Sequence, residues 1–288
     1  MAASEPIVYI NGEYLPQSQA TVSVLDRGFL FGDGVYEVIP VFAGKPLRLT
    51  EHLDRLQRSM NRVSLKNPLT QHEWEEIFQT LLESNPGGDR SIYLQVTRGA
   101  APIRDLSFSA DIEPTAFVMV NEIKPVDYAK LEKGIEAITV DDFRWKACDI
   151  KSVSLIANVM IRLSANVQNV MDAIMVRDGL VTEGTASNIF VVHGGIISTP
   201  PKSDCVLPGI TRDLVIDLAL ANGLTVDERD IKQGELETAD EIWLTSSTRE
   251  IAPVVKLDNR VVGDGIAGDC WKKIIALYQD YKQELRNG

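Results

Sequence analysis

The sequence predicts an α+β protein of two domains. A chain of 288 residues exceeds one small core and suits two domains of ordinary size or one large α/β unit. Its strand-like segments come in hairpins, and no G-x-G-x-x-G motif opens a helix after a strand, which argues against a Rossmann fold. A polar, proline-containing stretch separates two halves of different character. We therefore expect an N-terminal domain over 1–120, a linker over 121–126 and a C-terminal domain over 127–288.

The N-terminal half begins with two expected hairpins. Asn11 and Gly12 form the two-residue turn between the first strand pair, and residues 43–45 turn a second pair that starts near Gly34. Residues 50–63 then place apolar side chains at helical spacing, with acidic residues in the first turn. The sequence thus predicts a small sheet followed by an amphipathic helix.

A second helix is expected after Thr70, because Thr70 and Glu73 have the capping-box spacing. Two apolar segments, 91–99 and 115–123, follow it and have the composition of buried strands.

The C-terminal half combines a meander of strands with three helices. Its glycine turns separate short strands, and each helix has an apolar periodicity. The expected order is a strand over 134–143, a helix over 152–168, an antiparallel meander over 172–199, a helix over 209–223, strand pairs over 241–265 and a helix over 266–285.

The composition of the chain limits which classes of partner and which cellular compartment are expected. The chain has 41 acidic and 29 basic residues, a formal charge of −12, which argues against nucleic acid or an anionic membrane as the main partner. No apolar run approaches the roughly 18 residues needed to span a bilayer. The three cysteines lack metal-ligand spacing and cannot all pair, and no charged-then-apolar leader precedes the first strand. We expect a cytoplasmic protein with no metal site.

The segment CDIKS places Lys151 just before an apolar helical run. A lysine in such a context is ordinarily a solvated surface charge. Four other motifs accompany it: EHLDRL at 51–56, LVTEG at 180–184, PGITRD at 208–213 and LTSST at 244–248. In order and spacing, these five motifs resemble the D-amino acid transaminases, members of the branched-chain-aminotransferase-like fold type IV pyridoxal-phosphate enzymes. The resemblance runs from about residue 7 to about residue 280.

The resemblance implies a fold, a cofactor and a reaction. The fold would have a smaller N-terminal, sandwich-like domain on the substrate side and a larger C-terminal, β-barrel-like domain with flanking helices. Pyridoxal 5'-phosphate would bind in the cleft between the domains of a homodimer. The reaction would be transamination of D-amino acids of the D-alanine or D-glutamate type with a 2-oxo acid such as 2-oxoglutarate or pyruvate.

The resemblance also assigns the two main catalytic groups. Lys151 would bind the cofactor as a Schiff base and move a proton between the substrate and cofactor carbons. Glu183 would meet the pyridine nitrogen and keep it protonated. By its sequence alone, a glutamate before a glycine is more often an ordinary turn residue. Thr185, Ser187 and Asn188 follow it and cannot be ranked.

A phosphate site is expected at the start of the helix after Pro208. Ile210 and Thr211 would offer free backbone N–H groups and the positive end of the helix dipole. Thr211 could equally be a plain N-cap residue. Ser247, in LTSST, is the hydroxyl that best matches the phosphate ligand by spacing.

Two further cofactor contacts follow from the resemblance. It directs Arg55 to the phosphate, whereas the alternative is an exposed helical pair with Glu51. It directs Leu207 to the face of the cofactor ring, although Leu207 could equally be a core residue.

Substrate contacts are expected from the N-terminal half. Tyr36 matches a tyrosine near the substrate carboxylate, with a core tyrosine as the alternative. The carboxylate-binding motif of the family reads Arg, any residue, His, any residue, Phe. Here Arg104 and Phe108 fit, but Leu106 occupies the histidine position and one extra residue lies in the loop. The extra residue could instead turn Arg104 outward as a surface charge. Arg98 is a reserve candidate whose strand-end position favours a structural ion pair.

Several other functions remain open. A branched-chain L-amino acid aminotransferase and an R-selective amine transaminase share the fold, but DIKS in place of a glycine-rich sequence after the lysine favours the D-specific group. A lyase acting on aminodeoxychorismate fits less well. A non-catalytic pyridoxal-phosphate binding protein would keep Lys151 and the phosphate site but show no turnover.

Overall fold

The computed structural model describes residues 5–109 and 111–287. The chain divides into two compact units. The first unit runs to Lys124 and includes the later segment Ile150–Ser154; the second comprises Pro125–Asp149 and continues from Leu155. The chain thus passes between the units within the stretch 121–126, but the segment that carries Lys151 belongs to the first unit.

The first unit is built on a six-stranded antiparallel sheet in the order β2-β1-β6-β5-β3-β4. Its strands are β1 (Ile7–Ile10), β2 (Glu13–Pro16), β3 (Gly34–Phe42), β4 (Lys45–Pro46), β5 (Arg90–Thr97) and β6 (Thr115–Glu122). Its helices are α1 (Arg27–Phe31), α2 (Leu49–Arg62) and α3 (Gln71–Ser84), with a 3-10 turn over Gln17–Gln19.

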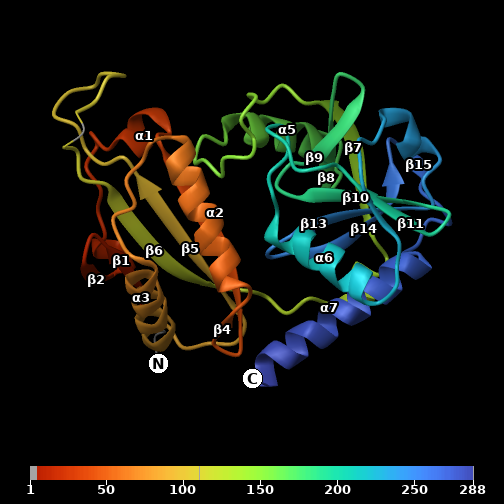
Figure 1. Cartoon of the computed structure of the whole chain (residues 1–288), viewed down its shortest axis with the longest axis horizontal. Coiled ribbons are helices and arrows are strands. Elements are labelled where there is room, and N and C mark those ends of the chain that lie inside the picture. The colour runs from red at the N-terminus through yellow and green to blue at the C-terminus, as the bar shows by residue number, and fades with distance from the viewer. Residues whose placement is uncertain (1–4, 110, 288) are drawn as a thin grey trace. The chain divides into compact units, whose positions relative to one another are not determined.

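Local sequence signals explain much of this unit. Asn11 and Gly12 both have positive φ, at 46° and 96°, and turn β1 into β2 as expected. The expected capping box is present: the Thr70 side chain accepts from the Glu73 N–H while Glu73 caps Thr70. Helices α2 and α3 pack against the sheet (Figure 1). The helix α1 was not expected.

The second unit is built on a nine-stranded mixed sheet in the order β12-β11-β10-β13-β14-β7-β8-β9, with β15 paired to β14. Its strands are β7 (Ile135–Asp141), β8 (Asp172–Arg177), β9 (Leu180–Gly184), β10 (Asn188–His193), β11 (Ile196–Thr199), β12 (Val226–Glu228), β13 (Glu241–Ser246), β14 (Glu250–Leu257) and β15 (Arg260–Val261). Its helices are α4 (Tyr128–Leu131), α5 (Ile156–Val167), α6 (Ile210–Ala221) and α7 (Asp269–Asn287), with a 3-10 helix over Gln233–Glu237.

This sheet curves into the barrel-like form that was expected. Strand β9, at one end of the strand order, lies against β10 near the other end. The expectation that the strands come in hairpins holds for the antiparallel pairs of this sheet but misses three parallel pairs: β7 runs parallel to β8 and to β14, and β11 runs parallel to β12. Helix α5 makes the crossover between β7 and β8, as parallel neighbours require.

Helix α5 begins at Ile156, four residues after the expected start. Ser152 instead forms an isolated β-bridge with Val35, so its backbone pairs with β3 of the first unit and does not begin the helix.

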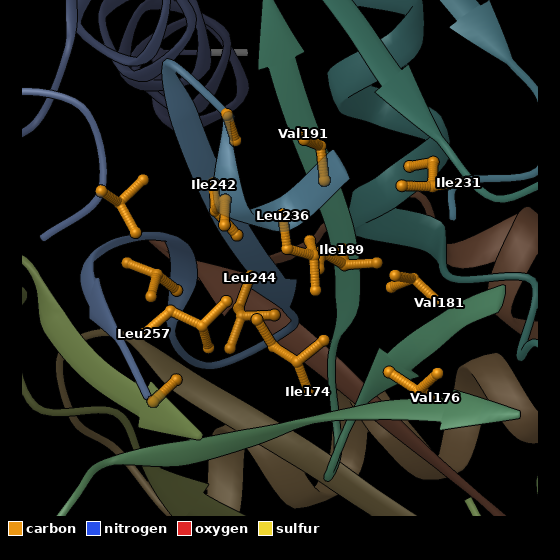
Figure 2. Packing of buried hydrophobic residues seen from close by; sticks show 14 residues of the cluster. Ile174, Val176, Val181, Ile189, Val191, Ile231, Leu236, Ile242, Leu244 and Leu257 are labelled. Atoms are coloured by element: carbon orange, nitrogen blue, oxygen red, sulfur yellow. The ribbon is translucent and has the colours of Figure 1, made fainter. Parts of the chain in front are cut away.

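The core of the second unit fills the inside of the curved sheet. Figure 2 shows a cluster in which Ile189, Val191 and Leu244 meet Ile174 and Val181; these five side chains are at most 3% exposed. They come from β8, β9, β10 and β13, so this one apolar core holds the strands that carry Glu183 and Asn188. Removing one of these large side chains would cost about 2–5 kcal/mol.

Candidate active site

Lys151 lies on a short segment fixed beside β3. The backbone N–H of Tyr36 donates to the carbonyl of Lys151 over 2.9 Å, and the N–H of Lys151 donates to Ser59 Oγ over 3.2 Å. Ser59 is buried on α2. Two elements of the first unit therefore fix the backbone of this lysine.

The side chain of Lys151 lies over an aromatic ring. Its Nζ is 4.4 Å from the centroid of the Tyr36 ring, and the residue is half-buried. Tyr36 in turn stacks on Tyr93, with 5.8 Å between centroids. The contact of an ammonium with a ring face is worth about 0.5–2 kcal/mol. Lys151 is therefore held by its surroundings, unlike a solvated surface lysine.

Arg55 belongs to a buried charge cluster in the first unit. Its Nε and Nη2 each donate to one oxygen of Glu37, both over 2.7 Å, and His52 Nδ1 lies 2.8 Å from Glu37 Oε2. The expected alternative, an exposed pair of Arg55 with Glu51, is not what forms, because Glu37 takes the guanidinium and Glu51 pairs with Arg48.

Burial and charge set the ionisation of this cluster. Burial alone would raise the pKa of Glu37, but the charge and hydrogen bonds of Arg55 outweigh it and lower that pKa well below its usual range. Burial lowers the pKa of His52, so its ring is neutral at neutral pH. A carboxylate only accepts hydrogen bonds, so His52 Nδ1 carries the proton and Nε2 carries a lone pair. Within the described part of the chain, no group hydrogen-bonds that buried Nε2.

Glu183 lies buried on β9 of the second unit, so an ordinary exposed turn is wrong for it. One carboxylate oxygen accepts from Arg144 Nη1, and the other accepts from the Leu207 N–H over 3.1 Å. Asn188 Nδ2 also lies 3.4 Å from the second oxygen and donates to the Leu207 carbonyl over 2.8 Å. The carboxylate is thus fixed from two sides.

Arg144 connects Glu183 to a second carboxylate. Its Nε and Nη2 donate to the two oxygens of Asp142 over 2.9 and 2.8 Å, and Arg177 lies 3.0 Å from Asp142. Two guanidinium groups and two carboxylates therefore balance in charge when all four are ionised. Burial alone would lower the pKa of Arg144, but the hydrogen bonds that it donates to Asp142 and the charges of Glu183 and Asp142 raise it and hold the guanidinium in its charged form.

The pKa values of the two carboxylates are moved in opposite directions. Burial raises the pKa of Glu183, and Arg144 offsets part of that rise. The pKa of Asp142 is lowered to about 2, because hydrogen bonds from Arg144 outweigh the effect of burial. We assign the ionised form to Glu183 at neutral pH, because a neutral Glu183 would leave the buried cluster with a net positive charge.

The N-terminus of α6 has the properties of an anion site. Gly209 is its N-cap residue and has no side chain to cap it, so Ile210 and Thr211 begin the helix with free N–H groups beside the positive end of the dipole. Thr211 as an N-cap residue is wrong, because it is the second helical residue. A Cβ at Gly209 would overlap the side-chain oxygen of Asn188. Asn188 therefore packs between this helix start and Glu183.

The LTSST motif ends β13 beside the same asparagine. Thr245 pairs with Asn188 across the sheet, and Ser247 is half-buried in the turn that follows. The hydroxyl of Thr245 is buried without a hydrogen-bond partner among the residues that the structure describes. An unsatisfied buried hydroxyl costs about 1–3 kcal/mol. It is thus available to a ligand together with the helix start.

The residues of the second unit fit pyridoxal phosphate. A fixed carboxylate suits a protonated pyridine nitrogen, and the uncapped helix start suits a phosphate. Leu207 is half-buried and lies outside the apolar core of Figure 2. Its backbone N–H donates to Glu183 and its carbonyl accepts from Asn188, which packs against the helix start. Sequence reasoning noted Arg144 only as a cation near Lys151, missed its pairing with Glu183, and did not rank Asn188, because these contacts span 39 and 19 residues.

Arg104 and Arg98 differ sharply in environment. Arg104 is exposed on the segment between β5 and β6, with its guanidinium carbon 4.9 Å from the centroid of the Phe31 ring. Arg98 is buried, and its Nε and Nη2 donate to the two oxygens of Asp33 over 2.8 and 2.9 Å. The expected structural ion pair of Arg98 is therefore present.

The described residues contain neither a cluster suited to a metal ion nor a helix suited to a membrane. Across 5–109 and 111–287, no group of three or more His, Cys, Asp or Glu side chains is placed to hold a metal ion. Over the same residues, no helix has the length and apolar character needed to cross a membrane.

Comparison with known proteins identifies the family. Residues 34–257 match the family described as Amino-transferase class IV. The chain is 38% identical over 273 residues to a D-alanine aminotransferase of Bacillus licheniformis, covering 95% of this chain and 96% of that one. It is 37% identical over 275 residues to one of Staphylococcus aureus (strain COL), covering 95% and 97%.

Solved structures agree on the fold. The branched-chain aminotransferase of the archaeon Thermoproteus uzoniensis with norvaline superimposes with a TM-score of 0.86 at 27% identity, covering 97% of this chain and 95% of that one. A branched-chain amino acid aminotransferase solved with pyridoxamine 5'-phosphate gives a TM-score of 0.89 at 26% identity, covering 98% and 95%. The family match spans most of the chain and contains Lys151, Glu183 and the start of α6. The protein therefore belongs to the class IV aminotransferases.

Proposed function

We propose that this protein catalyses pyridoxal-phosphate-dependent transamination of D-amino acids, of the D-alanine or D-glutamate type, with a 2-oxo acid such as 2-oxoglutarate or pyruvate. Similarity to D-alanine aminotransferases over 95% of the chain supports the reaction. The structural observation that carries the proposal is the buried Glu183 carboxylate, which Arg144 holds in the same unit as the uncapped start of α6.

Glu183 and the helix start would bind the two ends of the cofactor. When bound, pyridoxal phosphate supplies a ring that accepts the electron pair left when the substrate Cα loses its proton. Glu183 would keep the pyridine nitrogen protonated, since its carboxylate is ionised and fixed. The N–H groups of Ile210 and Thr211 would bind the phosphate.

Three further side chains complete the proposed cofactor site. Ser247 would add a hydroxyl to the phosphate, and Leu207 would pack against the ring. Arg55 would face the phosphate as a cation whose orientation is set by its two hydrogen bonds to Glu37. Because Glu37 fixes the guanidinium, little side-chain entropy would be lost on binding.

Lys151 is the proposed catalytic residue. Its Nζ would hold the cofactor covalently until the substrate amine displaces it, and the freed amine would then accept the proton from the substrate Cα and deliver it to the cofactor carbon that had carried the lysine. The backbone bonds to Tyr36 and Ser59 fix where this amine starts. Tyr36 and Arg104 are the proposed contacts of the substrate carboxylate, and together they would distinguish amino acids from simple amines.

The proposed roles of the domains follow from this division of groups. The first unit, with Tyr36 and Arg104, would be the substrate side, and the second unit, with Glu183 and the start of α6, would bind most of the cofactor. A branched-chain L-amino acid aminotransferase is the second candidate function, because solved enzymes of that kind share the fold at 26–27% identity. An R-selective amine transaminase is the third.

A homodimer in the cytoplasm is also part of the proposal. Ile156, Val159, Met160, Leu163 and Val167 are 50–82% exposed and follow one face of α5, so a second copy of the chain would bury an apolar stripe. The three free cysteines are compatible with a reducing compartment.

The dimer is tested by light scattering. Val159→Glu would shift the mass toward that of a monomer, whereas the control Leu220→Glu, at a side chain 56% exposed on α6, would not. A monomeric wild-type protein would contradict this part of the proposal.

The function is tested by borohydride reduction of the protein mixed with pyridoxal phosphate, followed by peptide mapping. The label should appear on the peptide that contains Lys151, and addition of D-alanine before reduction should prevent it. Label on another lysine would refute the assignment. Label on Lys151 that D-alanine, L-leucine and an R-configured amine all fail to prevent would indicate a binding protein without turnover.

A further inference from the structure

The structure points to a specificity role for a residue that the reaction does not otherwise use. We propose that Arg27 is a positioning residue: it fixes the segment 100–109, here called the Arg104 loop, so that Arg104 is held ready for the substrate carboxylate. This inference rests on the proposed function, because it explains how the proposed carboxylate contact is kept in place.

Arg27 makes an unusual set of contacts for a residue on a five-residue helix. It is 3% exposed. Its Nη1 donates to the carbonyl of Asp105 over 2.5 Å and its Nη2 donates to the carbonyl of Leu106 over 3.0 Å. Its backbone N–H also donates to the carbonyl of Gly99 over 2.9 Å. Arg27 therefore holds both the base and the tip of the Arg104 loop.

Packing alone would not hold this loop. Ile103 and Leu106 are 67% and 77% exposed, so they bury little apolar surface. Two carbonyls bonded by one buried guanidinium are charge-assisted contacts, which are about twice as strong as neutral ones. Backbone contacts of Ala100 and Ala101 hold the start of the loop, through a bridge to Asp26 and a hydrogen bond to the carbonyl of Leu25, whereas its tip depends mainly on Arg27 and on Phe108.

Phe108 is the second anchor, and two guanidinium groups lie over its ring. The guanidinium carbon of Arg98 is 4.1 Å from the Phe108 centroid, and that of Arg27 is 5.1 Å away. Both arginines also donate to Asp33, Arg27 through Nε over 2.9 Å. Burial alone would raise the pKa of Asp33, but hydrogen bonds from Arg98 and Arg27 lower it, so the group that orients both arginines stays ionised at neutral pH.

Arg104 shares an aromatic ring with Arg27. The two guanidinium carbons lie 4.9 and 4.8 Å from the centroid of Phe31. Arg104 directly precedes Asp105, whose carbonyl Arg27 binds. Because the backbone is fixed at this point, the Arg104 side chain has fewer accessible conformations. It would therefore lose less conformational entropy on binding a carboxylate. Leu106 occupies the position at which the family has a histidine, so no histidine on the loop can orient Arg104. Arg27 would orient it instead, by fixing the backbone beside it.

The test compares Arg27→Met and Arg27→Lys with the control Arg260→Lys, at an exposed residue that pairs with Glu237. Lysine can keep a positive charge beside Asp33, but its single nitrogen on a shorter side chain lacks the planar fork by which Arg27 reaches Asp33 and both carbonyls through three separate nitrogens. We expect each Arg27 variant to raise the KM for D-alanine by about tenfold with little change in kcat, while turnover of an R-configured amine without a carboxylate stays within about twofold. The control should match the wild type on both substrates.

A double-mutant cycle separates positioning from general damage. If Arg27 acts through Arg104, adding Arg27→Lys to Arg104→Ala should change the KM for D-alanine by less than about twofold. Independent losses that multiply would overturn the proposal, as would an equal loss on the R-amine.

Limited proteolysis tests the conformation of the Arg104 loop independently of transaminase activity. Chymotrypsin should cleave Arg27→Lys after Leu106 or Phe108 at least about fivefold faster than the wild type, at unchanged melting temperature. Equal cleavage rates would overturn the proposal. If Arg27→Met does not fold, Arg27→Lys and Phe108→Ser give the same comparison. The proposed carboxylate contact would be refuted by a wild-type protein without D-amino acid turnover, or by an Arg104→Ala variant with unchanged KM. The proteolysis experiment would still test whether Arg27 fixes the loop.

Discussion

Replacing Glu183 with glutamine is the sharpest perturbation of the proposed cofactor site. Both carboxylate oxygens accept hydrogen bonds, one from Arg144 and the other from the Leu207 N–H. Glutamine has only one acceptor oxygen, so its NH2 group must face one of these two donors. Loss of the charge also leaves the cluster of Asp142, Arg144 and Arg177 with an excess positive charge.

The size of the effect follows from these contacts. A hydrogen bond to a charged group is worth about 1.5–3 kcal/mol. If the carboxylate acts mainly when negative charge develops on the cofactor ring, its loss lowers kcat by about 10- to 100-fold. Cofactor binding should fall less, because the groups proposed for the phosphate are intact.

The assay compares Glu183→Gln with Glu237→Gln, a change at an exposed carboxylate on the same unit. The kcat for D-alanine with 2-oxoglutarate is measured at saturating cofactor, and the cofactor dissociation constant is measured by absorbance titration. An unchanged kcat at saturation would refute the role given to Glu183. A loss of folding, seen as a lowered melting temperature without cofactor, would move its role from catalysis to structure.

Three further predictions concern other parts of the account. Arg104→Ala should raise the KM for D-alanine by at least about tenfold, the loss expected for one charge-assisted contact, while activity toward an R-amine changes little; equal losses would mean that Arg104 only supports its loop. Glu37→Gln should cost about 3–5 kcal/mol in the free energy of unfolding at neutral pH. Because folding lowers the pKa of Glu37 from 4.5, its contribution to stability is present above about pH 4.5 and is lost as the pH falls. Urea titrations should therefore show the unfolding free energies of mutant and wild type converging in acid; a constant difference would contradict this. Gly209→Ala should weaken cofactor binding at least about tenfold by displacing Asn188, whereas Gly234→Ala, where a Cβ meets nothing, should not; equal affinities in a titration would disprove the packing argument.

Local signals allowed much of the fold to be predicted. The positive φ values of Asn11 and Gly12 are what a tight hairpin requires, and the capping box of Thr70 is complete within four residues. The parallel pairing of β7 with β8 was missed, because hydrophobic patterns show where strands occur but not which strands become neighbours.

The site shows the same limit at the level of single residues. The resemblance to a known family singled out Lys151 and Glu183, yet the groups that orient them come from far along the chain. Ser59 contacts Lys151 across 92 residues and Arg144 contacts Glu183 across 39. Arg27 reaches the Arg104 loop across 78 residues, and a lone arginine before a glycine carries no sign of that contact. Such partners follow from tertiary structure and not from periodicity or spacing.

The most direct test of the central claim is the choice of amino donor. Purified protein loaded with pyridoxal phosphate is given D-alanine, L-alanine or L-leucine separately, each with 2-oxoglutarate, and formation of the oxo acid is followed. The account predicts turnover with D-alanine at a kcat/KM at least about a hundredfold above either L-amino acid, a difference of about 2.7 kcal/mol in transition-state binding. A higher kcat/KM with L-leucine than with D-alanine would contradict it and would favour a branched-chain aminotransferase.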